Sequence, residues 1–229
     1  MKIHGLMKMT LLDYPGLVAC TVFLGGCDMR CPYCHNWELL DMNAPAIMDD
    51  EELLAFLNTR KGLLDAVVFT GGEALLRNDL AEVIRKVRKL GFKIKLDTNG
   101  NHPDKLKNIV EEGLIDYVAM DVKNSPDRYG MTIGLPEFST VRIGESIEYL
   151  LHGPVEYEFR TTVVKQFHDE ESFRQIGEWI RGAKRYYLQG FVDRDTVPYE
   201  GLSACSREQM ETFLTIVAPC VQTAEIRGV

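Results

Sequence analysis

Three cysteines stand within one short stretch of this chain, and they are the residues whose type and spacing most directly indicate chemistry. The stretch reads GGCDMRCPYCHN, and the cysteines are Cys27, Cys31 and Cys34. Thiolates bind zinc and the irons of iron–sulfur clusters, and closed sites of either kind take four protein ligands. A set of three therefore predicts a metal or cluster with one coordination position left for another molecule.

The other three cysteines, Cys20, Cys205 and Cys220, stand alone in the sequence. In a reducing compartment, isolated cysteines are metal ligands or buried thiols rather than disulfides. We predict that each is a small buried hydrophobe, although one of them could complete a zinc site with the triplet.

The elements that must position the triplet follow from an alternation of apolar runs and amphipathic stretches over 229 residues. The apolar runs predict strands covered on both faces and therefore parallel. The predicted strands are Leu17 to Leu24, Ala66 to Thr70, Lys93 to Thr98, Tyr117 to Asp121, Glu156 to Val164 and Arg185 to Gln189.

Helical periodicity fills the intervals between these strands. The predicted helices are Asp50 to Asn58, Asp79 to Leu90, Asp104 to Glu112, Thr140 to Leu151, Glu170 to Arg181 and Ser206 to Val217. Asp49 or Asp50 is expected to cap the first helix and Asn78 the second, because short polar side chains accept hydrogen bonds from free amides. The basic residues between Arg85 and Lys95 are expected to form a solvated face, and the alternative is that they dock an acidic partner or electron donor.

About six strand–helix units predict an α/β barrel or an open partial barrel, in which reactive groups gather where the strands end. No linker or change of composition interrupts the pattern, so one domain over residues 1–229 is expected. Polar or glycine residues do follow nearly every strand; they are Gly71, Gly72, Glu73, Asp97, Thr98, Asn99, Gly100, Asp121, Lys123, Arg160, Thr161, Gln189 and Gly190. The Gly- and Pro-rich segment Asn124 to Pro136 follows the fourth strand and is expected to border the site.

The cysteine spacing C-x-x-x-C-x-x-C, with an aromatic before the last cysteine, resembles the signature of the radical S-adenosylmethionine (SAM) enzymes. The segments KMTLLDYPG, TGGEALL, LDTNG and MDVK resemble, within that superfamily, the glycyl-radical-enzyme activating enzymes. The similarity is strongest to activating proteins of anaerobic ribonucleoside-triphosphate reductase and extends to those of pyruvate formate-lyase. It implies the radical SAM fold, a partial (β/α)6 TIM-like barrel. Ala74 departs from the family, which often has Pro after Gly-Gly-Glu.

The resemblance implies the cofactors and the reaction. Three thiolates would hold three irons of a 4Fe-4S cluster, and SAM would chelate the fourth iron through its amino and carboxylate groups. Reductive cleavage of SAM would give a 5'-deoxyadenosyl radical, which would abstract hydrogen from a glycine of a partner glycyl-radical enzyme. No protein side chain beyond the cluster ligands is assigned a catalytic role.

The resemblance also implies which residues would contact SAM. The turn of Gly71, Gly72 and Glu73 would approach its amino group, and the remaining candidates are Tyr33, Asn36, Asp97, Asp121, Lys123, Arg160 and Gln189. Asp97, Thr98 and Asp121 would hold a monovalent cation beside it. The alternative for the charged residues is a structural salt bridge, and Arg160 could equally pair with a neighbouring Glu. His35 is expected to be a hydrogen-bonding residue without a catalytic role.

Charge and composition narrow the partners. The net charge of −8 argues against nucleic acid or an anionic membrane as the main partner. The chain lacks an apolar leader with a cleavage site and any run of about 18 apolar residues, so a cytoplasmic location is expected. Because no cysteine lies between Cys34 and Cys205, one cluster is expected, with flavodoxin or ferredoxin as the electron donor.

Rival hypotheses explain less of the sequence. Cys31-Pro-Tyr-Cys34 matches a glutaredoxin dithiol, and with His35 it matches the haem attachment pattern. Neither explains Cys27 or the residues after the strands, and a zinc site leaves the Gly-Gly-Glu and Asp-Thr-Asn-Gly segments without a role. A radical SAM enzyme acting on a small molecule and a non-catalytic iron–sulfur module remain as alternatives.

Overall fold

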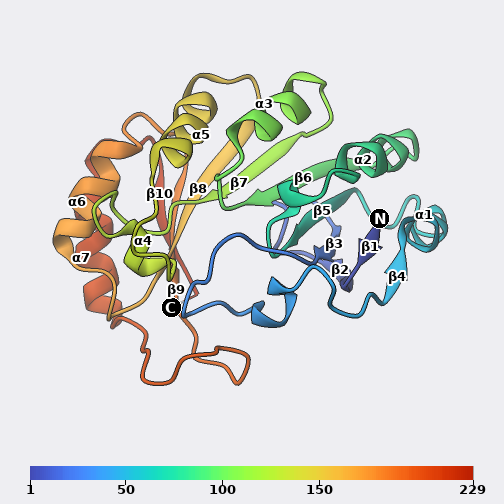
Figure 1. Cartoon of the computed structure of the whole chain (residues 1–229). Helices are drawn as coiled ribbons and strands as arrows, with labels where there is room; N and C mark the ends of the chain where they lie inside the picture. The colour runs from blue at the N-terminus through green and yellow to red at the C-terminus, as the bar shows by residue number, and fades with distance from the viewer. Residues whose placement is uncertain (229) are drawn as a thin grey trace. The chain divides into compact units, whose positions relative to one another are not determined.

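The computed structural model describes residues 1–228 and shows an α/β fold (Figure 1). The packing divides it into two compact units. The first comprises residues 1–28, 38–98 and 104–118, and the second comprises residues 29–37, 99–103 and 119–228. The single domain over residues 1–229 stays a prediction. Within residues 1–228, no helix has the length and apolar character needed to cross a membrane.

The first unit is built on four paired strands: β2 (Gly5–Thr10), β3 (Ala19–Leu24), β5 (Ala66–Gly71) and β6 (Lys93–Thr98). The pairs β3 with β5 and β5 with β6 are parallel, as predicted. The pair β2 with β3 is antiparallel and contains a register shift, which the sequence did not predict. A separate antiparallel pair joins β1 (Lys2–Ile3) to β4 (Met48–Asp49).

Two helices of the first unit begin where short acidic side chains stand. The helix α1 (Asp50–Asn58) has Asp49 as its cap, and Glu52 completes a capping box. The helix α2 (Leu80–Lys89) begins after Asp79, which makes no capping side-chain bond. The prediction that Asn78 caps α2 was wrong, because its side chain instead accepts a hydrogen bond from Lys105 Nζ at 3.0 Å.

The second unit contains three parallel strands: β8 (Glu156–Val163), β9 (Tyr186–Gly190) and β10 (Ala224–Arg227). Its helices are α4 (Tyr129–Thr132), α5 (Val141–His152), α6 (Glu170–Trp179) and α7 (Arg207–Val217). The helices α6 and α7 lie side by side, and Phe173 of α6 stacks on Phe213 of α7 at 4.5 Å between ring centroids (Figure 1). Apolar side chains on the paired helices and on β8 and β9 form the core of this unit.

Some elements cross the boundary between the units or are single turns. They are α3 (Pro103–Glu111), β7 (Tyr117–Asp121) and the 3-10 helices η1 (Trp37–Leu40), η2 (Ala74–Leu76) and η3 (Ala218–Cys220). All six predicted strands and all six predicted helices are present with ends within two residues of the prediction. The short strands β1, β2, β4 and β10 were missed, because short or partly exposed runs lack a distinct period.

Candidate active site

The Gly-Gly-Glu turn follows β5 in the first unit and lies against the backbone that directly precedes Cys27. Gly71 has a φ of +123°, and a Cβ there would stand 2.3 Å from the backbone nitrogen and oxygen of Leu24. A Cβ on Gly72 would stand 2.1 Å from the carbonyl oxygen of Gly26. Both glycines are therefore required by the chain's own backbone, in addition to any approach of a ligand.

Hydrogen bonds of Glu73 hold this turn in place. Its side chain is fully buried and accepts hydrogen bonds from the amide of Leu75 and from Thr98 Oγ1, each at 2.9 Å. Its own amide donates to the carbonyl of Gly26 at 2.7 Å. Ala74 begins η2 directly after it and is buried.

Asp97 ends β6 beside a buried cation. Lys95 Nζ donates to Asp97 Oδ1 at 2.5 Å, and the Lys95 side chain is only 2% exposed. The prediction of a solvated basic face was therefore wrong for Lys95, because its ammonium is compensated by Asp97 inside the unit. It holds for Arg85, Lys86 and Arg88, which make partly exposed ion pairs with acidic residues.

The cysteine loop enters the second unit at residues 29–37. The Cys31 thiol is buried and Cys34 is half-buried, with the Cys34 amide donating to the Cys31 carbonyl at 3.1 Å. The amide of Arg30 donates to the carbonyl of Ile133 at 2.9 Å, and a Cβ on Gly134 would stand 2.4 Å from the Arg30 carbonyl oxygen. The segment Asn124 to Pro136 thus borders the cysteine loop, as predicted.

Burial and nearby charge act in opposite directions on the two thiols of this segment. Burial raises the pKa of Cys31 to about 11, although Lys123 opposes this rise. Burial also raises the pKa of Cys34, and the backbone amide of Asn36 and the Lys123 ammonium oppose that rise. Because metals bind thiolates, metal binding requires that both thiols lose their protons. The Lys123 ammonium favours this loss.

Asp121, Lys123 and Arg160 form one half-buried ion network beside Cys31. Lys123 Nζ donates to Asp121 Oδ2 at 2.8 Å, and Arg160 Nε donates to Asp121 Oδ1 at 2.9 Å. Burial disfavours the Asp121 carboxylate, yet Arg160 and Lys123 together lower its pKa to about 2. The structural salt bridge weighed for these residues is therefore present, and Arg160 pairs with Asp121.

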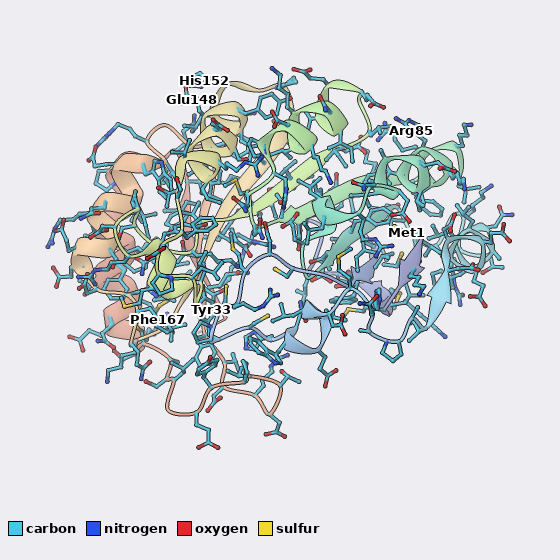
Figure 2. The ribbon with its side chains drawn as sticks, in the orientation of Figure 1. Met1, Tyr33, Arg85, Glu148, His152 and Phe167 are labelled. Atoms are coloured by element: carbon cyan, nitrogen blue, oxygen red, sulfur yellow. The ribbon has the colours of Figure 1, made fainter. Side chains whose placement is uncertain are left out.

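Tyr33 lies between Cys31 and Cys34 in the sequence, and its ring packs against Phe167 at 5.9 Å between centroids (Figure 2). The side chain is 4% exposed, and its hydroxyl is a buried polar atom without a hydrogen-bond partner in residues 1–228. Burial raises its pKa well above the ordinary value, so the hydroxyl keeps its proton. A buried, unpartnered donor beside two thiols is a position at which an acceptor on a ligand would be stabilised.

The remaining predicted residues occupy less distinctive positions. Gln189 lies in β9 opposite Thr162 and Arg227, and Asn36 is half-buried after Cys34. Cys20 and Cys205 are buried, as predicted. The prediction was wrong for Cys220, which is only half-buried because it lies in the surface turn η3.

Three polar residues near the site were not predicted. The carbonyl of Lys123 accepts from His168 Nε2 at 2.9 Å, the hydroxyl of Tyr129 donates to the Asp121 carbonyl at 3.5 Å, and His4 Nδ1 accepts from the amide of Gly25 at 2.9 Å. Burial lowers the pKa of both histidines, so both are neutral near pH 7. Lone residues far along the chain from their partners carry no local sequence signal, and only the fold reveals them.

The donor chemistry of the described residues fits an iron–sulfur cluster and its ligand. Within residues 1–228 the cysteines of the triplet form no disulfide, the two glycines of the turn have no side chains, and Tyr33 has a buried hydroxyl without a hydrogen-bond partner. Within residues 1–228, no three His, Cys, Asp or Glu side chains are grouped to hold a single metal ion. A cluster differs from a single ion, because each of its cysteine ligands binds a different iron.

Comparison with known proteins identifies the class. The sequence family described as the radical SAM superfamily matches residues 21–180. The solved structure of SuiB from Streptococcus suis bound to precursor peptide SuiA has a TM-score of 0.69 and 13% identity, covering 91% of this chain and 48% of SuiB. These matches confirm the predicted radical SAM fold, an α/β fold of partial TIM-barrel type.

Two curated relatives narrow the class. A protein assigned as a glycyl-radical enzyme activating enzyme in Methanocaldococcus jannaschii is 32% identical over 86% of this chain and 83% of its own length. The pyruvate formate-lyase 1-activating enzyme of Escherichia coli K12 is 30% identical over 79% of this chain and 75% of its own length. The chain therefore belongs to the radical SAM superfamily, in the family of glycyl-radical-enzyme activating enzymes. Radical SAM enzymes use a 4Fe-4S cluster and SAM, so these are its cofactors.

Proposed function

We propose that the chain activates a partner enzyme by abstracting hydrogen from one of its glycines, and that anaerobic ribonucleoside-triphosphate reductase is the partner. The observation that carries the activation is the similarity to the Methanocaldococcus jannaschii relative over most of both chains. The segment KMTLLDYPG resembles activators of anaerobic ribonucleoside-triphosphate reductase, the first choice, and also those of pyruvate formate-lyase. Pyruvate formate-lyase is the second candidate, favoured by the Escherichia coli relative.

Cys27, Cys31 and Cys34 are proposed to bind three irons of the cluster, which leaves the fourth for SAM. When bound, the two cofactors supply a 5'-deoxyadenosyl radical through reductive cleavage of SAM. The protein must hold Cys31 and Cys34 as thiolates against the effect of burial. Lys123 supplies the nearest favourable charge, because its ammonium lowers the pKa of both thiols.

The ion network is proposed to bind the carboxylate of SAM. Lys123 and Arg160 are two half-buried cations held beside Asp121. Both side chains are donors suited to the carboxylate of a ligand. The Gly71-Gly72-Glu73 turn is proposed for the amino group, and Tyr33, Asn36 and Gln189 for other parts of SAM.

The monovalent cation at Asp97, Thr98 and Asp121 also stays a proposal. In the described structure these side chains bond to Lys95, to Glu73 and to the Lys123–Arg160 pair respectively. A cation would share carboxylate oxygens with those groups. The electron donor is proposed to be flavodoxin or ferredoxin, because the cysteines of the chain predict only one cluster. The compartment is proposed to be the cytoplasm, where cysteines stay reduced.

The partner is tested by measuring 5'-deoxyadenosine from the reduced, cluster-loaded protein and SAM under anaerobic conditions. Purified anaerobic ribonucleoside-triphosphate reductase, pyruvate formate-lyase, or neither is added, and Cys31→Ser is the inactive control. We expect formation to be stimulated most by the reductase. If only pyruvate formate-lyase stimulates 5'-deoxyadenosine formation, pyruvate formate-lyase is the partner. If all three mixtures form 5'-deoxyadenosine equally, and only when a small molecule is added, the proposal that the chain activates a protein is contradicted.

A further inference from the structure

The segment carrying Cys31 and Cys34 is attached at two places in the second unit, and one of them is not explained by cofactor binding. Before Cys31, the amide of Arg30 is bonded to the carbonyl of Ile133. After Cys34, His35 Nε2 lies 2.6 Å from the carbonyl oxygen of Val192. Because a carbonyl oxygen can only accept, Nε2 must carry the proton and donate.

Ring contacts strengthen the second attachment. The His35 ring stacks on Phe191 at 5.7 Å between centroids and 8° between planes, and Phe191 is only 2% exposed. Two residues further on, Trp37 meets Tyr199 edge-to-face at 6.4 Å. Both partners of these rings belong to residues 191–204, which follow β9 and are called the strap below.

The strap is fixed at its ends and exposed between them. At its start, the amide of Phe191 donates to the carbonyl of Val163 at 3.3 Å. At its end, Ala204 pairs with Val164, and the carbonyl of Ser203 accepts from the amide of Lys165 at 3.0 Å. Residues 192–196 between these ends are exposed. His35 contacts the strap near its start, at Phe191 and Val192, and Trp37 contacts its middle at Tyr199.

We propose that His35 is a positioning residue for Cys34: it ties the cysteine loop to the strap and so fixes the third cluster ligand. The proposal rests on the proposed function, because it takes Cys34 as a ligand. It assigns His35 no contact with iron or SAM. The backbone link from Cys34 to His35 is one residue long, so displacement of the His35 ring displaces the Cys34 thiol as well.

Two variants of His35 separate the effect of its hydrogen bond from the effect of its side-chain volume. His35→Gln keeps an N–H donor near the position of Nε2, whereas His35→Leu keeps the volume and removes the donor. His152→Leu is the matched control, because His152 lies exposed at the end of α5 beside Glu148 (Figure 2). If His35→Leu does not fold by circular dichroism, Phe191→Leu replaces it, since that change removes the ring on which His35 stacks.

The first readout is limited trypsin cleavage of the cofactor-free protein after Arg194, an exposed residue of the strap, quantified by mass spectrometry. Loss of one hydrogen bond should raise the cleavage rate about five-fold in His35→Leu and leave His35→Gln and His152→Leu near wild type. Unchanged cleavage in His35→Leu, or equal acceleration in His35→Gln, would overturn the proposal. This assay needs neither cluster nor partner, so its failure is distinct from failure of the proposed function.

The second readout follows the ligand itself. In the reconstituted protein, His35→Leu should release iron to a chelator about five-fold faster than wild type and alter the paramagnetic resonance spectrum of the reduced cluster. His35→Gln should show the wild-type rate of iron release and the wild-type spectrum. A loosened strap with wild-type iron release and an unchanged spectrum would show that His35 holds the strap but does not position Cys34, which contradicts the proposal.

Discussion

At the residue scale, the charged side chains at the described site lie beside groups of opposite charge. Asp121 uses both carboxylate oxygens for Lys123 and Arg160, and Lys95 is compensated by Asp97. Removing one member of such a pair leaves an uncompensated buried charge, which costs more than the pair contributes. Tyr33 is the contrary case, since its buried hydroxyl has no partner in residues 1–228.

The Asp121 network predicts a specific acid dependence of stability in the cofactor-free protein. The folded-state pKa of Asp121 is about 2, below its ordinary value of 3.8. Its ionisation therefore stabilises the fold above about pH 4, and this contribution, on the order of 2 kcal/mol, is lost as the pH falls toward 2. Urea denaturation should show Asp121→Asn much less stable than wild type at pH 6, with the gap narrowing below pH 4.

An exposed carboxylate supplies the control for this measurement. Glu145→Gln on α5 should follow the wild-type curve at every pH, because Glu145 is exposed. A stability gap for Asp121→Asn that stays constant from pH 6 to pH 3 would show that the carboxylate charge is not what the network requires.

At the element scale, the turn after β5 shows why local sequence and backbone packing must agree. Gly72 has no room for a Cβ, because the carbonyl oxygen of Gly26 would be 2.1 Å away. Ala74 is different: it is the first residue of η2, and the preceding Glu73 already has an extended backbone, with φ −126° and ψ 110°. That conformation suits a residue before proline, and proline is favoured at the first position of a helix.

Two substitutions in this turn should therefore have opposite outcomes. Gly72→Ala should lower the free energy of unfolding by about 2 to 4 kcal/mol and reduce iron loading, because backbone must move to admit the methyl group. Ala74→Pro should leave stability within about 1 kcal/mol of wild type. Thermal denaturation and iron content measure both. Equal behaviour of the two variants would show that the tight packing around Gly72 does not constrain the turn.

The same scale shows what the sequence could predict. Buried strands with continuous apolar runs, such as Tyr117–Asp121, were located to the residue, because their burial leaves a clear pattern. The edge strand β2 was missed, since Met7, Lys8 and Met9 are all exposed and show no alternation. Its antiparallel pairing with β3 depends on contacts that no local window contains.

At the scale of the whole molecule, the candidate residues were predictable because the radical SAM signature and the strand ends are local features. The hydrogen bonds and ion pairs of these residues were not predictable from the sequence. The pairing of Arg160 with Asp121, the support of Lys123 by His168 and the attachment of His35 to Val192 all join residues far apart in sequence. Such contacts follow from the order in which strands are paired, which the sequence pattern restricts but does not specify.

The central claim is that the radical chemistry of this chain is delivered to a glycine of another protein. The most direct test is electron paramagnetic resonance of an anaerobic mixture of the reconstituted protein, SAM, a reductant and anaerobic ribonucleoside-triphosphate reductase. A stable glycyl radical on the reductase should form with the wild-type chain and be absent with Cys34→Ser. Cleavage of SAM without any glycyl radical, with the reductase or with pyruvate formate-lyase, would contradict the claim.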